Sequence, residues 1–344
     1  MTAKVTESDN NFTVLRLSLA LMVVLGHAKL LSGTAWPHFP FNLADAAVDA
    51  FFVVSGYLIT GSYQRCHGLR SFYVRRIFRL YPMYLCIVLA QTVAMLLLLP
   101  AGPFSEGAAT LRYVAANAVL ANFVQYDIGG VLDGLRNPGI NPSLWTLKIE
   151  IGFYLIVPAI YAATQRWGPR VLAAIFVASV AYAVVLQHRG DLRLAQQLPG
   201  QLQFFVTGMA LYLYGQRLRV APWLAGLITV AFFTVWSFVQ PIPEGLRPLI
   251  VAAFVHSVAL STPPLRLRTD LSYSVYLIHG PLLQILILFG VFRDTPAWIG
   301  GIVLTVLGLA WVTERLIERP GTEFGRMLAI RLAQPRAIVV QARS

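Results

Sequence analysis

Long apolar runs, separated by short polar segments, follow one another along almost the whole chain. A helix that crosses the bilayer core, roughly 30 Å thick, needs about 20 predominantly apolar residues. Runs of this length predict about ten membrane-spanning helices, near residues 12–31, 44–62, 78–99, 144–162, 170–187, 200–216, 222–240, 248–262, 271–291 and 297–316. We therefore expect an all-α integral membrane bundle forming a single domain over 1–344, with a core of about 11–320 and a basic cytoplasmic tail at 321–344.

The positions of the arginines predict the orientation of the bundle. Cytoplasmic loops of membrane proteins are enriched in Lys and Arg, and here arginines concentrate in alternate loops and in the tail. The segment 111–124, whose apolar part is short and contains Asn117 and Asn122, would invert every later loop if it crossed the membrane. We therefore predict a partial or interfacial outer helix there, and both termini in the cytoplasm. The arginines of the predicted inner segments are Arg65, Arg70, Arg75, Arg76, Arg79, Arg166, Arg170, Arg217, Arg219, Arg266, Arg268, Arg315, Arg319, Arg326, Arg331, Arg336 and Arg343.

Composition supports a membrane environment and removes several other classes. Hydrophobic residues make up 57% of the chain and charged residues only 12%, about half of what soluble domains carry. The net charge of +12 does not indicate nucleic acid binding, because the arginines lie in clusters between apolar runs. The polar N-terminus lacks a cleavable signal pattern, so a multi-pass protein of the inner (plasma) membrane is expected. Cys66 and Cys86 suggest neither a disulfide nor a metal site, and no metal is expected.

Ionisable residues inside predicted spans are candidates for function, because each costs several kcal/mol unless it is paired or lines a wet cavity. Arg16 and His27 lie on the first span, about 16 Å apart along a helix, with His27 about one turn below the outer surface. Asp49 on the second span and Glu150 on the fourth are expected at a similar depth. A carboxylate that orients an imidazole beside an acceptor hydroxyl is a general-base arrangement.

Two further features complete the candidate set. His279 lies near the middle of the ninth span, where it either lines the path of an acyl chain or bonds a neighbouring helix. Arg76 and Arg79 are one helical turn apart directly before Tyr81-Pro82, and paired guanidinium groups suit a phosphate-bearing ligand.

Each candidate also has a structural interpretation. His27 could be a buried structural histidine, and the arginines could mark topology alone. Asp49 and Glu150 could instead be charges that favour the N-terminal ends of their helices.

These residues occur within motifs that resemble acyltransferase family three, the membrane O-acylases of sugars, lipopolysaccharide, exopolysaccharide and macrolides. The resemblance covers about residues 11–320, and Thr146 departs mildly from it because the family usually has Ser there. The motifs, in chain order, are Arg16 with His27; Val48 to Ile59; Arg76 to Pro82; Trp145 to Glu150 with Phe153-Tyr154 and Pro158; and Tyr273 to His279 with Pro281.

The resemblance implies an O-acetyltransferase type of enzyme. His27 would be its catalytic histidine, Arg16 the motif partner, and Arg76 and Arg79 part of an acyl-CoA site, while Asp49, Glu150 and Tyr273 match motif positions. Tyr273 and His279 would lie on the substrate path. The expected reaction moves an acyl group, expected to be acetyl, from cytoplasmic acyl-CoA to a hydroxyl of an extracytoplasmic or membrane-associated glycan or glycoside, directly or through an acyl-histidine.

The expected partners are acyl-CoA as donor substrate, the acceptor and the lipid bilayer, with no permanently bound cofactor and no nucleic acid. Because some relatives carry an additional extracytoplasmic domain, a separate partner on that side is a further expectation. A polytopic transporter or flippase for a sugar-containing substrate is the alternative, in which buried His and carboxylates bind substrate or relay protons. A structural membrane subunit would leave the buried ionisable residues unexplained.

Overall fold

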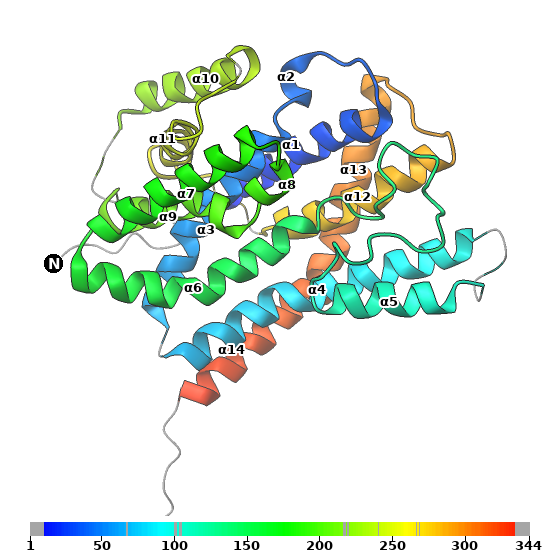
Figure 1. Cartoon of the computed structure of the whole chain (residues 1–344), viewed down its shortest axis with the longest axis horizontal. Helices are drawn as coiled ribbons and strands as arrows, with labels where there is room; N and C mark the ends of the chain where they lie inside the picture. Colours follow the sequence, from blue (N-terminus) through cyan, green and yellow to red (C-terminus); the bar gives the residue numbers. More distant parts are fainter. Residues whose placement is uncertain are drawn as a thin grey trace, which may run out of the picture.

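The computed structural model (Figure 1) describes residues 10–66, 68–99, 102, 105–215, 218, 220–239, 241–265, 267 and 269–333, apart from the side chain of His38. Regular structure in these residues is helical, and none of them forms a strand. This arrangement fits the predicted all-α class, because a helix satisfies its own backbone hydrogen bonds inside lipid.

Each predicted apolar run is a helix, with boundaries that differ by a few residues except at the start of α4. In chain order these helices are α1 (Phe12–Ser32), α3 (Ala44–Arg65), α4 (Leu69–Leu98), α6 (Trp145–Trp167), α7 (Arg170–His188), α9 (Leu198–Tyr214), α10 (Pro222–Phe238), α11 (Arg247–Leu260), α12 (Ser272–Leu288) and α13 (Pro296–Thr313). The remaining elements are α2 (His38–Phe41), α5 (Gly107–Ala118), α8 (Leu192–Ala195), a π-helical turn (Glu314–Glu318) and α14 (Arg319–Ala333).

Among the residues that the structure describes, six helices are long and apolar enough to cross a membrane, with α13 to α14 counted as one continuous helix from Pro296 to Ala333. Helices α10, α11 and α12 are apolar but shorter. The chain is thus a helical membrane protein, while the count of ten crossings and the side of the termini stay predictions. Helix α5 has 12 residues and spans about 18 Å, too short for a crossing, as its sequence indicated.

The centre of the bundle is built from α1, α3, α9 and α12. Helices α3 and α9 approach to backbone contact, because Gly56 and Gly208 face each other's helix. A Cβ at Gly208 would lie 2.0 Å from the carbonyl oxygen of Val53, and one at Gly56 would lie 2.1 Å from that of Phe205. Such small residues allow close helix packing in lipid, where apolar surface alone gives little preference for a partner. The close packing fixes α3, whose first turns contribute to the site described below.

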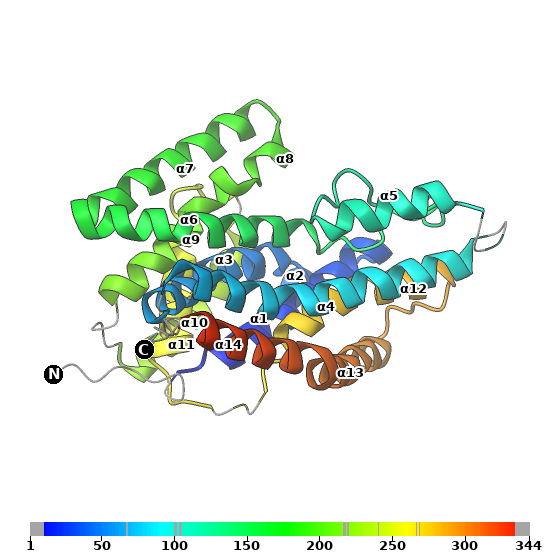
Figure 2. The ribbon, with the colours of Figure 1, turned by 90° about the horizontal axis from the view of Figure 1, so that it is seen from below.

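One prediction about α4 is corrected. Helix α4 begins at Leu69 and not near residue 78, so Arg70, Arg75, Arg76 and Arg79 are helical and not in a loop. Helix α14, which includes the described part of the predicted tail, packs along α4 (Figure 2). The predicted inner residues Arg217, Arg219, Arg266, Arg268, Arg336 and Arg343 lie outside the described residues.

Candidate active site

A pair of histidines lies where α1 packs against α12. Nδ1 of His27 is 2.8 Å from Nε2 of His279, and the two rings are stacked with centroids 5.0 Å apart. The side chain of His279 is fully buried, whereas His27 is partly accessible and lines a cavity. The sequence therefore identified both residues, but their direct contact is a product of the fold.

The partners of His279 determine which nitrogen carries its proton. Its Nδ1 lies 3.1 Å from the carbonyl oxygen of Val275, which can only accept a hydrogen bond. In the neutral ring Nδ1 is therefore the donor and Nε2 the acceptor, so Nδ1 of His27 donates to it. The Ser143 hydroxyl is a second, longer neighbour of Nε2, at 3.2 Å. This arrangement leaves Nε2 of His27 with its lone pair, and no described residue bonds to that nitrogen.

Neither carboxylate expected beside His27 bonds to it. Oδ2 of Asp49 accepts a hydrogen bond from Arg247 at 2.6 Å, and Oε1 of Glu150 accepts one from the Tyr154 hydroxyl at 2.5 Å. The sequence position of a residue predicts its depth along a helix but not the direction of its side chain around the helix axis. Asp49 lies on the face of α3 that is turned towards α11. The side chain that bonds to His27 is the imidazole of His279 and not a carboxylate.

Glu150 follows a segment of the chain that is already buried when α6 begins. The segment before α6 enters the bundle without helical structure. Its Asn141 donates to the carbonyl of Leu277 on α12 at 3.0 Å, and Ser143 is fully buried. Helix α6 then begins at Trp145 inside the bundle, and Glu150 lines the same cavity as Arg16.

This cavity, which we call the arginine cavity, lies at the N-terminal end of α1. Two carboxylates, of Glu150 and Asp270, face a larger number of guanidinium groups there. The arginines that line it are Arg16, Arg65, Arg75, Arg76, Arg79 and Arg326. The excess of positive charge suits a ligand with several phosphates.

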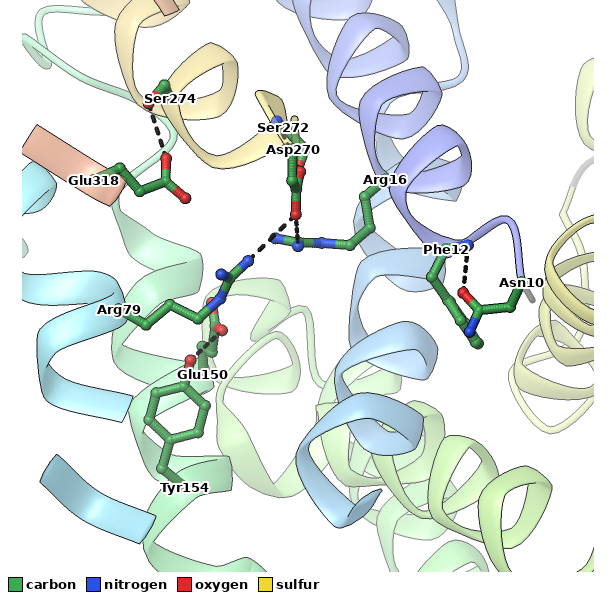
Figure 3. Close-up of polar contacts among 10 residues, drawn as sticks. All are labelled: Asn10, Phe12, Arg16, Arg79, Glu150, Tyr154, Asp270, Ser272, Ser274 and Glu318. Atoms are coloured by element: carbon green, nitrogen blue, oxygen red, sulfur yellow. Dashed lines mark hydrogen bonds and ion pairs between the residues drawn. The ribbon is translucent and has the colours of Figure 1, made fainter. Parts of the chain in front are cut away.

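Asp270 bridges two of these arginines from the loop before α12 (Figure 3). It forms ion pairs with Arg16 of α1 and with Arg79 of α4, the second at 3.3 Å. Burial opposes ionisation of this carboxyl, but the two guanidinium groups outweigh burial and hold its pKa below the usual value. Asp270 was not among the candidates predicted from the sequence, although its position directly before the Tyr273 motif could have indicated it.

Aromatic rings hold the central arginine of the cavity. The guanidinium of Arg76 lies 5.8 Å from the ring centroid of Phe72 and 5.7 Å from that of Tyr154. Nε of Arg76 and Nε of Arg75 are buried without a hydrogen-bond partner. Helix α14 adds Arg326 to the wall, so the part of the tail that packs on α4 belongs to the site.

A small apolar cavity continues from the arginine cavity towards the histidines. The two cavities share Arg16, Ser55 and Glu150 as lining residues. Phe51, Phe52, Tyr273 and Tyr276 form much of the apolar wall. The hydroxyl of Tyr273 donates to the carbonyl of Leu80 on α4 at 2.8 Å, which joins α12 to α4 at this point.

Tyr276 connects this apolar cavity to the histidine pair. Its ring centroid lies 5.9 Å from that of His279, and its hydroxyl is 2.9 Å from Oγ1 of Thr146. His27 itself lines a third cavity of about 870 Å³ at the other end of α1, together with Lys29, Asp45 and Arg136 among others. The histidine pair therefore separates a basic entrance from a second opening on the opposite side of the bundle.

Comparison with known proteins identifies the family of this chain. A family model described as an acyltransferase domain matches residues 9–315. Nodulation protein 10 of Rhizobium leguminosarum bv. viciae is 30% identical, over 94% of this chain and 95% of that protein. A putative membrane-bound transacylase, BcsY of Komagataeibacter xylinus, is 28% identical over 90% of this chain and 81% of its own length. An O-acetyl transferase of Shigella phage Sf6 is 26% identical over 90% and 95%. No solved structure matches significantly.

The chain is a helical membrane protein in which a basic cavity adjoins an apolar cavity close to a histidine pair. The chain belongs to acyltransferase family three, and it is an enzyme of the O-acetyltransferase type.

Proposed function

We propose that this enzyme transfers an acetyl group from acetyl-CoA, bound in the arginine cavity, to a hydroxyl of a glycan or glycoside that reaches His27 from the opposite side. The observation that carries the proposal is the series of shared lining residues between the arginine cavity and the apolar cavity, ending at Tyr276 beside the histidine pair. An O-acetyl transferase among the relatives supports acetyl as the group transferred.

The donor would be held by charge and shape. Charge-assisted bonds from Arg76, Arg79 and the other arginines of the cavity would hold the CoA phosphates, with Arg16 and Arg79 kept in place by Asp270. The acetyl thioester, which is uncharged, would extend into the apolar cavity next to Tyr273 and Tyr276. Glu150 would limit the positive charge where the two cavities meet.

The chemistry would use the free nitrogen of His27. Nε2 accepts the proton of the acceptor hydroxyl while the hydroxyl oxygen attacks the thioester carbonyl; the C–S bond breaks and the proton passes to the departing CoA thiolate. His279 acts as a positioning residue, because its Nε2 fixes the tautomer of His27 through Nδ1. Asp49, bonded to Arg247, would organise the neighbouring α3–α11 contact and not the imidazole.

We further propose that the protein is a multi-pass protein of the inner membrane, with about ten spans and both termini in the cytoplasm. The arginine cavity would then open to the cytoplasm, where acetyl-CoA is available. A reporter inserted at Gly168, between α6 and α7, should be cytoplasmic, and one at Gly134 extracytoplasmic. The opposite result at either position would contradict this orientation.

The function is tested with protein purified into lipid nanodiscs, labelled acetyl-CoA, and a saccharide extract from cells that lack the gene. Wild-type protein should transfer label to the extract, and His27→Ala should abolish transfer while acetyl-CoA affinity stays within about twofold, because the base acts in the transition state. The control is His188→Ala, since His188 is exposed on α7. Absence of transfer by the wild-type protein, together with saccharide uptake into proteoliposomes, would favour the transporter alternative.

A further inference from the structure

A fourth cavity lies between α3, α7, α9 and the N-terminal end of α11. Its lining is unusually rich in side-chain amides, contributed by Gln187, Gln196, Gln201 and Gln203. An amide offers both donors and an acceptor without net charge. We call this cavity the amide pocket.

Two of these amides are buried with unused hydrogen-bonding capacity. The side chains of Gln201 and Gln203 are 8% and 1% exposed, and Oε1 of each has no hydrogen-bond partner. Nε2 of Gln203 donates to the carbonyl of Gly200 at 3.0 Å, which fixes the orientation of that amide. Buried polar atoms in proteins are nearly always paired, so unpaired acceptors on two residues that line one cavity favour a ligand that supplies hydrogen-bond donors.

Three of the four charged residues that line the amide pocket, Asp49, Glu244 and Arg247, bond to one another. Arg247 donates to Asp49 at 2.6 Å and to Glu244 at 2.9 Å, and Glu244 also accepts from Gln187 at 2.7 Å. Arg247 is the one cation among the described residues that line this pocket, whereas the arginine cavity has six. An anionic ligand such as CoA therefore has no counter-charge here.

The pocket also has the apolar surfaces that a sugar ring needs. Trp145 and Phe204 belong to its wall, and their rings can cover the C–H face of a pyranose while amides bond its hydroxyls. Polyhydroxylated neutral ligands combine these two requirements. Anions and purely apolar molecules satisfy at most one of these two requirements.

The first turns of α3 join the amide pocket to the reaction centre. Asp45 lines both the amide pocket and the cavity that contains His27. Val48, one turn further on, lines both the amide pocket and the apolar cavity of the donor path. A ligand in the amide pocket can therefore extend past Asp45 to the histidine.

We propose that the amide pocket binds a sugar unit of the acceptor, next to the unit whose hydroxyl is acylated at His27. This inference rests on the proposed function. Gln201 and Gln203 accept hydrogen bonds from the sugar hydroxyls, and the Asp49–Arg247–Glu244 network holds the wall of the pocket. The pocket then selects the acceptor without contacting the donor.

The test measures transfer from labelled acetyl-CoA as the concentration of the saccharide extract is varied. Gln201→Met should raise the half-saturating extract concentration about tenfold, the effect of losing one hydrogen bond worth about 1.4 kcal/mol. Half-saturation by acetyl-CoA should change by less than about twofold. Gln196→Met, at a more exposed position, should act in the same direction. Gln197→Met is the matched control, because Gln197 does not line the pocket and bonds the carbonyl of Arg193.

The outcomes separate this inference from the proposed function. If wild-type protein transfers acetyl but folded Gln201→Met and Gln196→Met proteins keep the wild-type extract dependence, the amide pocket is not the acceptor site and the proposed function stands. If both variants lower the maximal rate without changing half-saturation, their role is structural and the inference is overturned. If wild-type protein transfers no acetyl group to the extract, the proposed function itself fails, and this inference with it.

Discussion

The contact between the two histidines makes a specific prediction about His279. Replacing it by Leu removes the acceptor for Nδ1 of His27, a bond of 2.8 Å to a fully buried imidazole. A donor without a partner costs about 1–3 kcal/mol when it is buried, so the tautomer with the proton on Nε2 gains up to that much relative to the active one. The active tautomer should fall about 5- to 150-fold in population. Loss of the orientation of the His27 ring should lower turnover further, up to the roughly 10²- to 10⁴-fold contribution of a general base.

The assay compares turnover, acetyl-CoA affinity and melting temperature of His279→Leu, His279→Gln and wild-type protein. His279→Gln should recover part of the turnover, because its amide oxygen can accept from Nδ1 of His27 as Nε2 does in the native protein. Acetyl-CoA affinity should hardly change in either variant. His256→Leu serves as the control, since His256 is buried on α11 and does not contact the pair.

One result would refute this reasoning about the tautomer. If folded His279→Leu protein keeps wild-type turnover, the imidazole of His279 does not position His27, and the free lone pair on Nε2 must have another origin. In another outcome, His279→Gln recovers no turnover, and in both variants turnover falls in proportion to melting temperature. His279 would then act only through packing.

Three other predictions follow from particular contacts. Replacing Arg76 and Arg79 together by Gln should weaken acetyl-CoA binding by about 3–6 kcal/mol, since each charge-assisted contact is worth roughly 1.5–3 kcal/mol. Unchanged affinity in titration calorimetry would mean that these arginines do not bind the donor and only mark topology. The folded pKa of Asp270 lies below its unfolded value, so ionised Asp270 stabilises the fold above about pH 4, and this stabilisation is lost as pH falls through the folded pKa. Asp270→Asn should therefore lower the melting temperature at pH 7. The melting temperature of this variant should also fall less steeply below about pH 4 than that of the wild-type protein. Gly208→Ala should destabilise the bundle by about 1–3 kcal/mol in thermal unfolding, whereas Gly300→Ala, at a position with open space, should not.

The sequence alone determined the class of the fold and most of the chemistry that the site contains. Apolar runs of membrane length have few structural alternatives, so every predicted run is a helix, and α5 was recognised as too short to cross. Ionisable residues inside apolar runs are costly, so His27, His279 and Arg16 stood out without any knowledge of their neighbours. Their assignment to catalysis or binding remains a prediction.

The same patterns could not determine which groups meet. Position along a helix gives depth, but the direction of a side chain around the axis depends on helix rotation and on where each helix begins. Asp49 therefore turned out to face Arg247, and Glu150 to line the arginine cavity, because α6 begins inside the bundle. From the sequence, Arg65, Arg75 and Arg326 were likewise interpreted only as topology signals. The sequence pattern did not predict the cavity that they share, because this cavity is formed by helices far apart in the sequence.

Tertiary structure also decided the partner of the catalytic candidate. His27 and His279 are separated by 252 positions and meet only because α1 and α12 pack together. The tautomer of His27 follows from that contact and from the Val275 carbonyl, one turn before His279, so it depends on packing between helices as well as on local helical geometry. Sequence therefore supplied the reactive groups, and packing supplied the direction of each hydrogen bond, because a hydrogen bond depends on distances of a few ångströms that no periodicity specifies.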